Sequence, residues 1–86
     1  MGLARQQISD GDLLGAAATL ERVIITRDDA VEPRLLYASV LCRLDDHQGA
    51  QAELKLLPDR PTPDAAWSEM TAACGPMERP DTGRSR

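Results

Sequence analysis

Aromatic side chains are almost absent from this 86-residue chain, which has no phenylalanine, one tyrosine (Tyr37) and one tryptophan (Trp67). Strands are enriched in aromatic and β-branched residues, so this composition speaks against a β-sandwich. Alanine and leucine must fill the interior instead, which favours close-packed helices. A chain of this length forms one small domain that buries about 60–65% of its unfolded surface, and we expect its stability to be modest.

An excess of basic residues and a long apolar run are also missing. The formal net charge is -4, and no cluster of lysine or arginine stands out. Nucleic acids and anionic lipid surfaces favour a basic patch, so we expect neither as a partner. No apolar run approaches the ~20 residues of a membrane span, and the start does not resemble a signal peptide. We therefore expect no membrane insertion, with the chain cytoplasmic as written and periplasmic if it is excised from a longer exported protein.

Groups that carry catalysis or bind metals are sparse. The only histidine, His47, stands beside Asp45 and Asp46. Cys42 lies one and a half helical turns earlier, and no third group is placed to orient the imidazole. The three residues of the turn would hold a metal only weakly, because tight sites draw ligands from separate elements. We predict no catalytic activity, no metal site and no cofactor.

The chain does contain an internal repeat. Sliding the sequence along itself until GDLLGAAATL (11–20) lies over DDHQGAQAEL (45–54) also aligns Ala4 with Ala38. The identical pairs are Asp12 and Asp46, Gly15 and Gly49, Ala16 and Ala50, Ala18 and Ala52, and Leu20 and Leu54. Such a period, about 34 residues, is typical of helix-turn-helix arrays. The small residues predict where two antiparallel helices approach most closely, so Ala50 is expected to be intolerant of a larger side chain.

Periodicity and stop signals predict five helices. We expect them at about residues 3–9, 13–26, 32–44, 47–57 and 64–74. Asp12 and Asp46 are predicted N-caps, and Gly11 suits a left-handed residue after the first helix. The buried face of the third helix is predicted to carry Tyr37, Val40, Leu41 and Leu44. Residues 1–76 would form the domain, and 77–86, with little apolar content, a disordered tail.

This pattern resembles the tetratricopeptide repeat family over roughly residues 3–74. Ala4 and Ala16 take the two small positions of a first repeat, and Ala38 and Ala50 those of a second. Trp67 would mark the first helix of a third, truncated repeat. The resemblance implies an all-α fold of antiparallel helical hairpins stacked as a short solenoid, with a plain helical bundle as the alternative.

Two features depart from the family's pattern. Asp45 stands where the second repeat usually has a turn glycine. The proline expected near the end of that repeat is displaced into the segment PDRPTP (58–63). These departures mark the repeats as degenerate.

The resemblance also implies a function, because such repeats bind a partner peptide or helix on a concave face lined by their first helices. By position, that face would carry Arg5, Ile8, Leu35, Ser39 and Arg43. Its two arginines suit a partner's carboxylate. Most of the Lys and Asn residues of the family's carboxylate clamp are missing, so we do not expect a chaperone C-terminus as ligand. The simpler interpretation, that Arg5 and Arg43 are solvated surface charges, stays open.

A structural role is the alternative to partner binding. Arrays with fewer than three full repeats leave apolar end faces uncovered. The chain would then be a self-associating module that forms a homo-oligomer, or a terminal fragment of a larger repeat protein such as a bacterial envelope protein.

Cys42 and Cys74 are expected near each other although they are far apart in the sequence. In a repeat array the first helices of successive repeats lie side by side, and the two cysteines hold nearly equal positions in theirs. A disulfide needs Cα atoms within ~7 Å, whereas an intracellular chain would keep both thiols reduced. We expect two packed free thiols in preference to a native disulfide.

Overall fold

The computed structural model describes residues 2–77, which form five helices. These are α1 (Gly2–Ser9), α2 (Leu13–Thr26), α3 (Val31–Arg43), α4 (His47–Lys55) and α5 (Asp64–Cys74). Each predicted helix is present, and their starts agree closely with the expected ones. The prediction of an all-α fold with five helices is confirmed.

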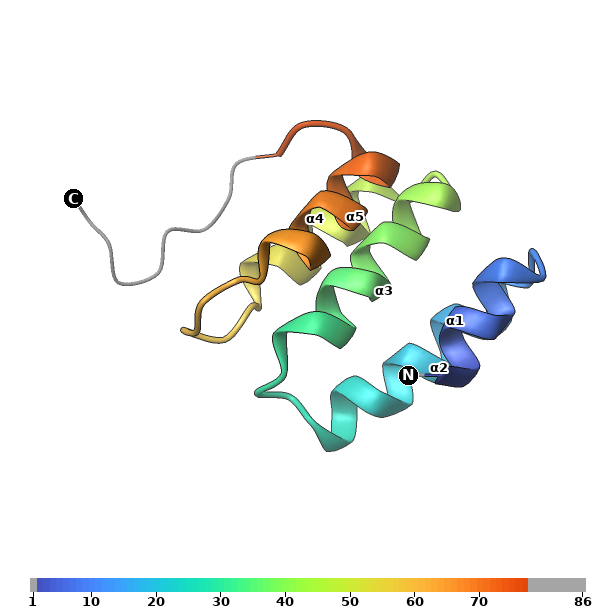
Figure 1. Ribbon diagram of the computed structural model, residues 1–86, viewed down its shortest axis with the longest axis horizontal. Helices are drawn as coiled ribbons and strands as arrows, with labels where there is room; N and C mark the ends of the chain where they lie inside the picture. Colours follow the sequence, from blue (N-terminus) through green and yellow to red (C-terminus); the bar gives the residue numbers. More distant parts are fainter. Residues whose placement is uncertain (1, 78–86) are drawn as a thin grey trace.

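The helices pack as two hairpins and one additional helix. α1 contacts α2, α3 contacts α4, and the hairpins meet where α2 contacts α3. α5 packs on α3, at the place of the first helix of a third repeat. In Figure 1, α1 and α5 flank α3, and α2 and α4 lie behind. α3 is therefore the central helix, with neighbours on three sides.

The same N-cap begins the second helix of both hairpins. The Asp12 carboxylate accepts a hydrogen bond of 3.0 Å from the Gly15 N–H, and the Asp46 carboxylate accepts one of 2.9 Å from the Gly49 N–H. This bond satisfies one of the unpaired N–H groups of the first helical turn. A Cβ atom at either glycine would overlap the capping carboxylate. The recurring glycine therefore follows from the position of the cap.

The turn before each cap is also repeated. Gly11 has φ 82°, and Asp45, with which the repeat aligns it, has φ 65°. The N–H of Asp12 donates to the Gln7 carbonyl, and the N–H of Asp46 to the Leu41 carbonyl, both at 2.8 Å. Glycine adopts this left-handed conformation without steric cost, whereas the Cβ of an L-residue crowds its carbonyl. The second turn thus keeps the geometry of the first at the expense of strain at Asp45.

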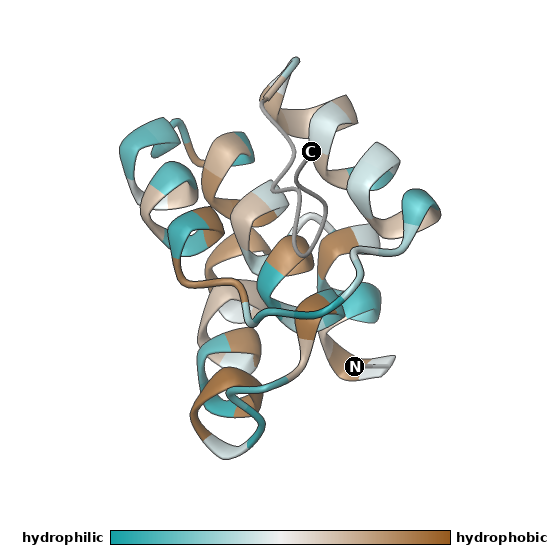
Figure 2. Ribbon diagram, turned by 90° about the vertical axis from the view of Figure 1, so that its left-hand side faces the viewer, coloured by the Kyte–Doolittle hydropathy of each residue, from teal (hydrophilic) through white to brown (hydrophobic). Residues whose placement is uncertain are grey.

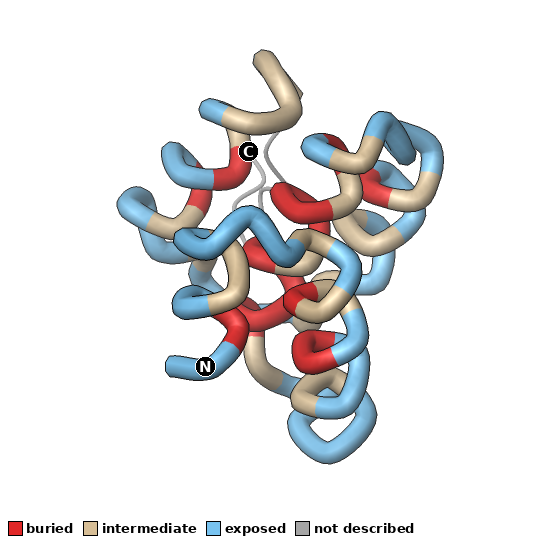
Figure 3. The backbone as a smooth tube through the Cα atoms, turned by 90° about the vertical axis from the view of Figure 1, so that its right-hand side faces the viewer, coloured by how far each residue is buried: buried red, intermediate tan, exposed pale blue. Residues whose placement is uncertain are grey.

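The core consists of two clusters that meet on α3. One joins α1, α2 and α3 through Ala4, Ala16, Leu20, Leu36 and Val40. The other joins α3, α4 and α5 through Val31, Leu35, Ala38, Cys42, Ala50, Trp67 and Met70. The four alanines at the small positions of the repeats are all 0% exposed. Figure 3 shows the buried segments meeting inside the array, and Figure 2 shows hydrophilic and hydrophobic residues alternating along the helices.

The predicted buried face of α3 is only partly correct. Val40 is fully buried, but Tyr37, Leu41 and Leu44 are only partly buried. Leu35, on the side that faces α5, and Leu36, which shares a cluster with Val40, are more deeply buried than these three. The difference arises because α3 is covered by α2, α4 and α5 together, so no single stripe describes its buried surface.

Polar side chains connect neighbouring helices at the margins of these clusters. Thr19 on α2 donates a hydrogen bond to Gln7 on α1 at 2.7 Å. Tyr37 on α3 donates one to Glu21 on α2 at 2.6 Å. Arg34 on α3 donates one to Glu53 on α4 at 2.8 Å. Burial, reinforced by the bond to Glu21, raises the pKa of the Tyr37 hydroxyl. Each contact between adjacent helices up to α4 thus includes one side-chain hydrogen bond.

The predicted tail lies outside the described residues, except for Met77, which is partly buried and packs against the cluster of α3, α4 and α5. Within residues 2–77, no helix has the length and apolar character needed to cross a membrane.

Replacing Ala50 by leucine should destabilise the protein by on the order of 1–3 kcal/mol, because the site is completely buried where α3 and α4 approach. Ala18→Leu is the matched control, since Ala18 is exposed on α2. Chemical denaturation followed by circular dichroism measures both. If neither variant changed the denaturation midpoint, α3 and α4 would not approach closely at Ala50.

Replacing Asp45 by glycine should stabilise the protein by about 0.5–1 kcal/mol, because glycine removes the strain of the left-handed conformation. Gly11→Ala, at the equivalent turn, should destabilise it by a similar amount. Thermal unfolding measures both shifts. A lower melting temperature for Asp45→Gly would show that the aspartate side chain stabilises the turn more than its φ angle costs.

Candidate partner-binding surface

The residues predicted to contact a partner lie on α1 and α3, in the layer that these two helices form with α5. Arg5 and Arg43 are exposed there, and Ile8 is partly buried. Leu35 is only 1% exposed, and Ser39 only 4%. The structure therefore separates the five expected residues: two arginines lie at the surface, and the centre of the expected face lies in the interior.

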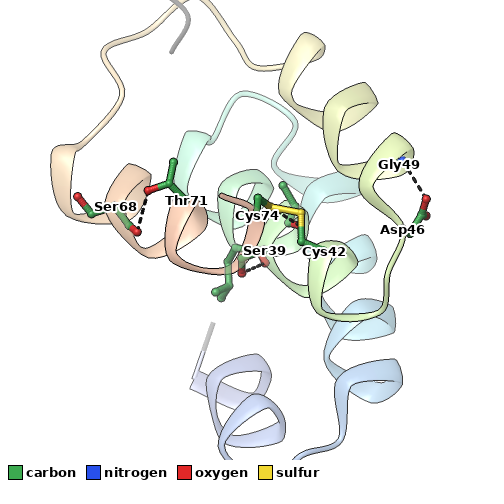
Figure 4. Close-up of a disulfide and its surroundings, with 9 residues drawn as sticks. Ser39, Cys42, Asp46, Gly49, Ser68, Thr71 and Cys74 are labelled. Atoms are coloured by element: carbon green, nitrogen blue, oxygen red, sulfur yellow. Dashed lines mark hydrogen bonds between the residues drawn. A yellow bond between two sulfur atoms is a disulfide. The ribbon is translucent and has the colours of Figure 1, made fainter. Parts of the chain in front are cut away.

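The burial of Leu35 has a direct cause in the position of α5, whereas the Ser39 hydroxyl is paired within its own helix. Leu35 belongs to the same apolar cluster as Trp67 and Met70 of α5. The Ser39 hydroxyl donates to the Leu36 carbonyl at 2.7 Å, within its own helix (Figure 4). Leu35 is therefore inaccessible to a partner while α5 stays on α3. The sequence predicted that the helix at 64–74 lies beside the third helix, but it did not predict that this contact buries Leu35.

Arg5 forms an ion pair that spans the layer from α1 to α5. Its two terminal nitrogens donate to the Glu69 carboxylate at 2.8 and 3.2 Å. The hydrogen bond to Glu69 is the main cause of a raised Arg5 pKa, and the charge of Glu32 adds to it. Both paired side chains are about half exposed, so the pair contributes only about 0–1 kcal/mol.

Glu69 was not predicted from the sequence, although one signal points to it. The shift that relates the first two repeats also aligns Leu35 with Glu69, so Glu69 occupies the same face position in the third repeat as Leu35 does in the second. The Glu69 carboxylate occupies both terminal nitrogens of Arg5.

Arg43 differs from Arg5 because it has no ion-pair partner within the described part of the chain. It is the last residue of α3. A cation there is favoured by the partial negative charge of the helix C-terminus. Its guanidinium is thus exposed and available for a carboxylate.

The two cysteines form a disulfide that joins α3 to α5 (Figure 4). The Cα atoms of Cys42 and Cys74 are 5.2 Å apart, within the usual range for such a bond. Their predicted proximity is confirmed, but the expectation of two free thiols is wrong. The last turn of α5 brings Cys74 directly against the end of α3. Closing a loop of this length stabilises the fold by roughly 3–4 kcal/mol in the chain-entropy model.

The acidic turn before α4 supplies the N-cap of this helix. Asp45 and Asp46 are exposed, as is His47. The Asp46 carboxylate is engaged by the Gly49 N–H. Across residues 2–77, no group of three or more His, Cys, Asp and Glu side chains is arranged to hold a metal ion.

A shallow cleft of about 440 Å³ lies where the α2–α3 and α4–α5 connections meet. Prolines line much of it, and its charged residues are Arg27, Asp29, Glu32 and Arg60. Arg60 donates to Asp29 at 3.2 Å across the two connections. Two positive and two negative side chains line the cleft, so the lining carries no net charge that would favour a cation or an anion.

Comparisons with known proteins agree with this geometry at the level of the family. A family model described as a tetratricopeptide repeat matches residues 7–74, more than half of the chain. No curated protein and no solved structure gives a match. The matched segment covers part of α1 and all of α2–α5.

Proposed function

Because this chain belongs to the tetratricopeptide repeat family, whose members are generally protein–protein interaction modules, we propose that it is a non-catalytic scaffold for a protein or peptide partner. The partner binds on the layer of α1, α3 and α5. The observation that carries this proposal is the exposed, unpaired guanidinium of Arg43 on that layer, within the described residues.

The chemistry of the accessible residues favours an acidic segment as the partner. Arg43 binds a carboxylate through two parallel hydrogen bonds, and such charge-assisted bonds are stronger than neutral ones. Arg5 donates to a second carboxylate when that group replaces Glu69, whose own carboxylate then returns to solvent. Ile8 supplies apolar contact beside Arg5, in the next turn of α1. Leu35 and Ser39 take part only if α5 moves away.

Reversing the two charges, with Arg5→Glu and Arg43→Glu together, should weaken retention of the partner by at least about 10-fold, since a hydrogen bond to a charged group is worth about 1.5–3 kcal/mol. The immobilised protein is incubated with an extract of its source cells, and the retained proteins are quantified by mass spectrometry. Arg22→Glu with Arg27→Glu, two exposed positions at or next to α2, is the matched control.

Circular dichroism checks that both double variants keep their helical content. Equal retention by wild type and by the Arg5 and Arg43 variant would place the binding surface elsewhere.

A second candidate function, self-association, is favoured by the outer face of α2. Leu14 and Ile25 are 74% and 78% exposed, and their spacing puts them on one side of the helix with Ala18 between them. Exposed apolar residues gathered on one face commonly mark a contact surface. In this case α2 packs against a second copy or against a neighbouring array.

Sedimentation equilibrium separates this candidate from a monomeric scaffold. The wild-type protein should then associate at micromolar concentrations, and Leu14→Gln with Ile25→Gln should abolish the association because it removes the apolar contact. A wild-type mass equal to one chain across the whole concentration range would reject self-association.

The disulfide favours one cellular compartment over another for this scaffold. Disulfides persist in oxidising compartments and are rare where glutathione keeps thiols reduced. The bond between Cys42 and Cys74 therefore favours the periplasmic expectation over the cytoplasmic one. Rapid acid quenching and alkylation of source cells reads out the bond directly, and free thiols in the quenched chain would count against this location.

A further inference from the structure

α5 is attached to the array by one side only. Its Trp67 and Met70 are buried against α3. α1 and α3 each pack against a following helix, but no following helix is present for α5 among the described residues. Ala72, which the repeat aligns with the buried Ala38, is accordingly exposed. α5 therefore lacks the second helix that secures the first helix of each complete repeat.

An ion pair and a disulfide link α5 to the rest of the array in addition to its apolar contacts, and they differ in strength. The ion pair between Arg5 and Glu69 is exposed to solvent and is screened by salt. The disulfide between Cys42 and Cys74 is covalent and closes at the last residue of α5. Cys74 is the more exposed of the two cysteines. The disulfide is thus the stronger of these two links, and it lies at the end of the helix that it secures.

The position of α5 decides whether the centre of the partner-binding layer is accessible. Leu35 lies in the same buried cluster as Trp67 and Met70, and Ser39 lies one turn before Cys42 on α3 (Figure 4). These are the two layer residues that the oxidised structure withholds from a partner. The helix secured by the disulfide is the helix that packs over Leu35.

We propose that the Cys42–Cys74 disulfide is a redox-sensitive latch that holds α5 over α3 and closes the centre of this layer. A dithiol reductant supplies two electrons and two protons. The sulfur–sulfur bond breaks, Cys42 and Cys74 each become a thiol, and the dithiol becomes a disulfide. Without the bond α5 opens from α3 more often, and each opening exposes Leu35. The use of this exposed surface by a partner rests on the proposed function, whereas the release itself does not.

Amide hydrogen exchange tests the latch on the full chain without any partner. Reduction with dithiothreitol should lower the protection of α5 amides by roughly 100-fold, because the loop closed by the disulfide no longer limits the open state. Trp67 is the only tryptophan, so its emission should shift to longer wavelength as α5 leaves α3. The amides of α2 should keep their protection.

The double variant Cys42→Ser with Cys74→Ser is the matched control, and it should show the reduced behaviour with or without dithiothreitol. Unchanged α5 protection after reduction would overturn the proposal. Equal loss of protection in α2 and α5 would also overturn it, because the disulfide would then hold the whole domain and not one helix. Free thiols in the air-oxidised protein would overturn it as well. A failed partner-retention experiment leaves these readouts unaffected, so the two proposals fail separately.

Discussion

The close approach of helices at four alanines is the constraint on which this structure depends. Ala4 and Ala16 in the first hairpin, and Ala38 and Ala50 in the second, have no exposed surface. A methyl side chain lets the helices pack tightly enough for leucines on either side to fill the remaining space. With only two aromatic residues in the chain, no large side chain bridges a wider gap. The spacing of the hairpins, and hence the place left for α5, follows from these contacts.

α3 turns this local constraint into a tertiary structure, because it contributes to both core clusters. Its central position explains why Leu35 and Ser39 are buried and why the partner-binding layer is closed at its centre. Arg43 is exposed at the end of α3, and Arg5, within α1, is paired with Glu69. Under the proposed function, a partner of the oxidised protein contacts these charges before it contacts apolar surface.

The contacts that hold α5 on α3 differ in the free energy that each contributes. An exposed ion pair such as Arg5–Glu69 is worth about 0–1 kcal/mol, whereas the disulfide is worth roughly 3–4 kcal/mol in the chain-entropy model. Burial of Trp67 and Met70 adds about 1.5–3 kcal/mol for each side chain of this size. The charged pair thus contributes least, although it is the most visible link across the layer.

The sequence by itself determined the features that depend on neighbours a few residues apart. The caps at Asp12 and Asp46, the turns at Gly11 and Asp45, and the helix starts all follow from short-range hydrogen bonds and steric limits, which a repeat makes visible twice. Only the tertiary structure decided that Cys42 bonds to Cys74, that Arg5 pairs with Glu69, and that Leu35 is covered. Each of these depends on the exact position of α5 on α3. The repeat predicted that these two helices lie side by side, but side-chain packing between segments far apart in the chain sets which atoms meet.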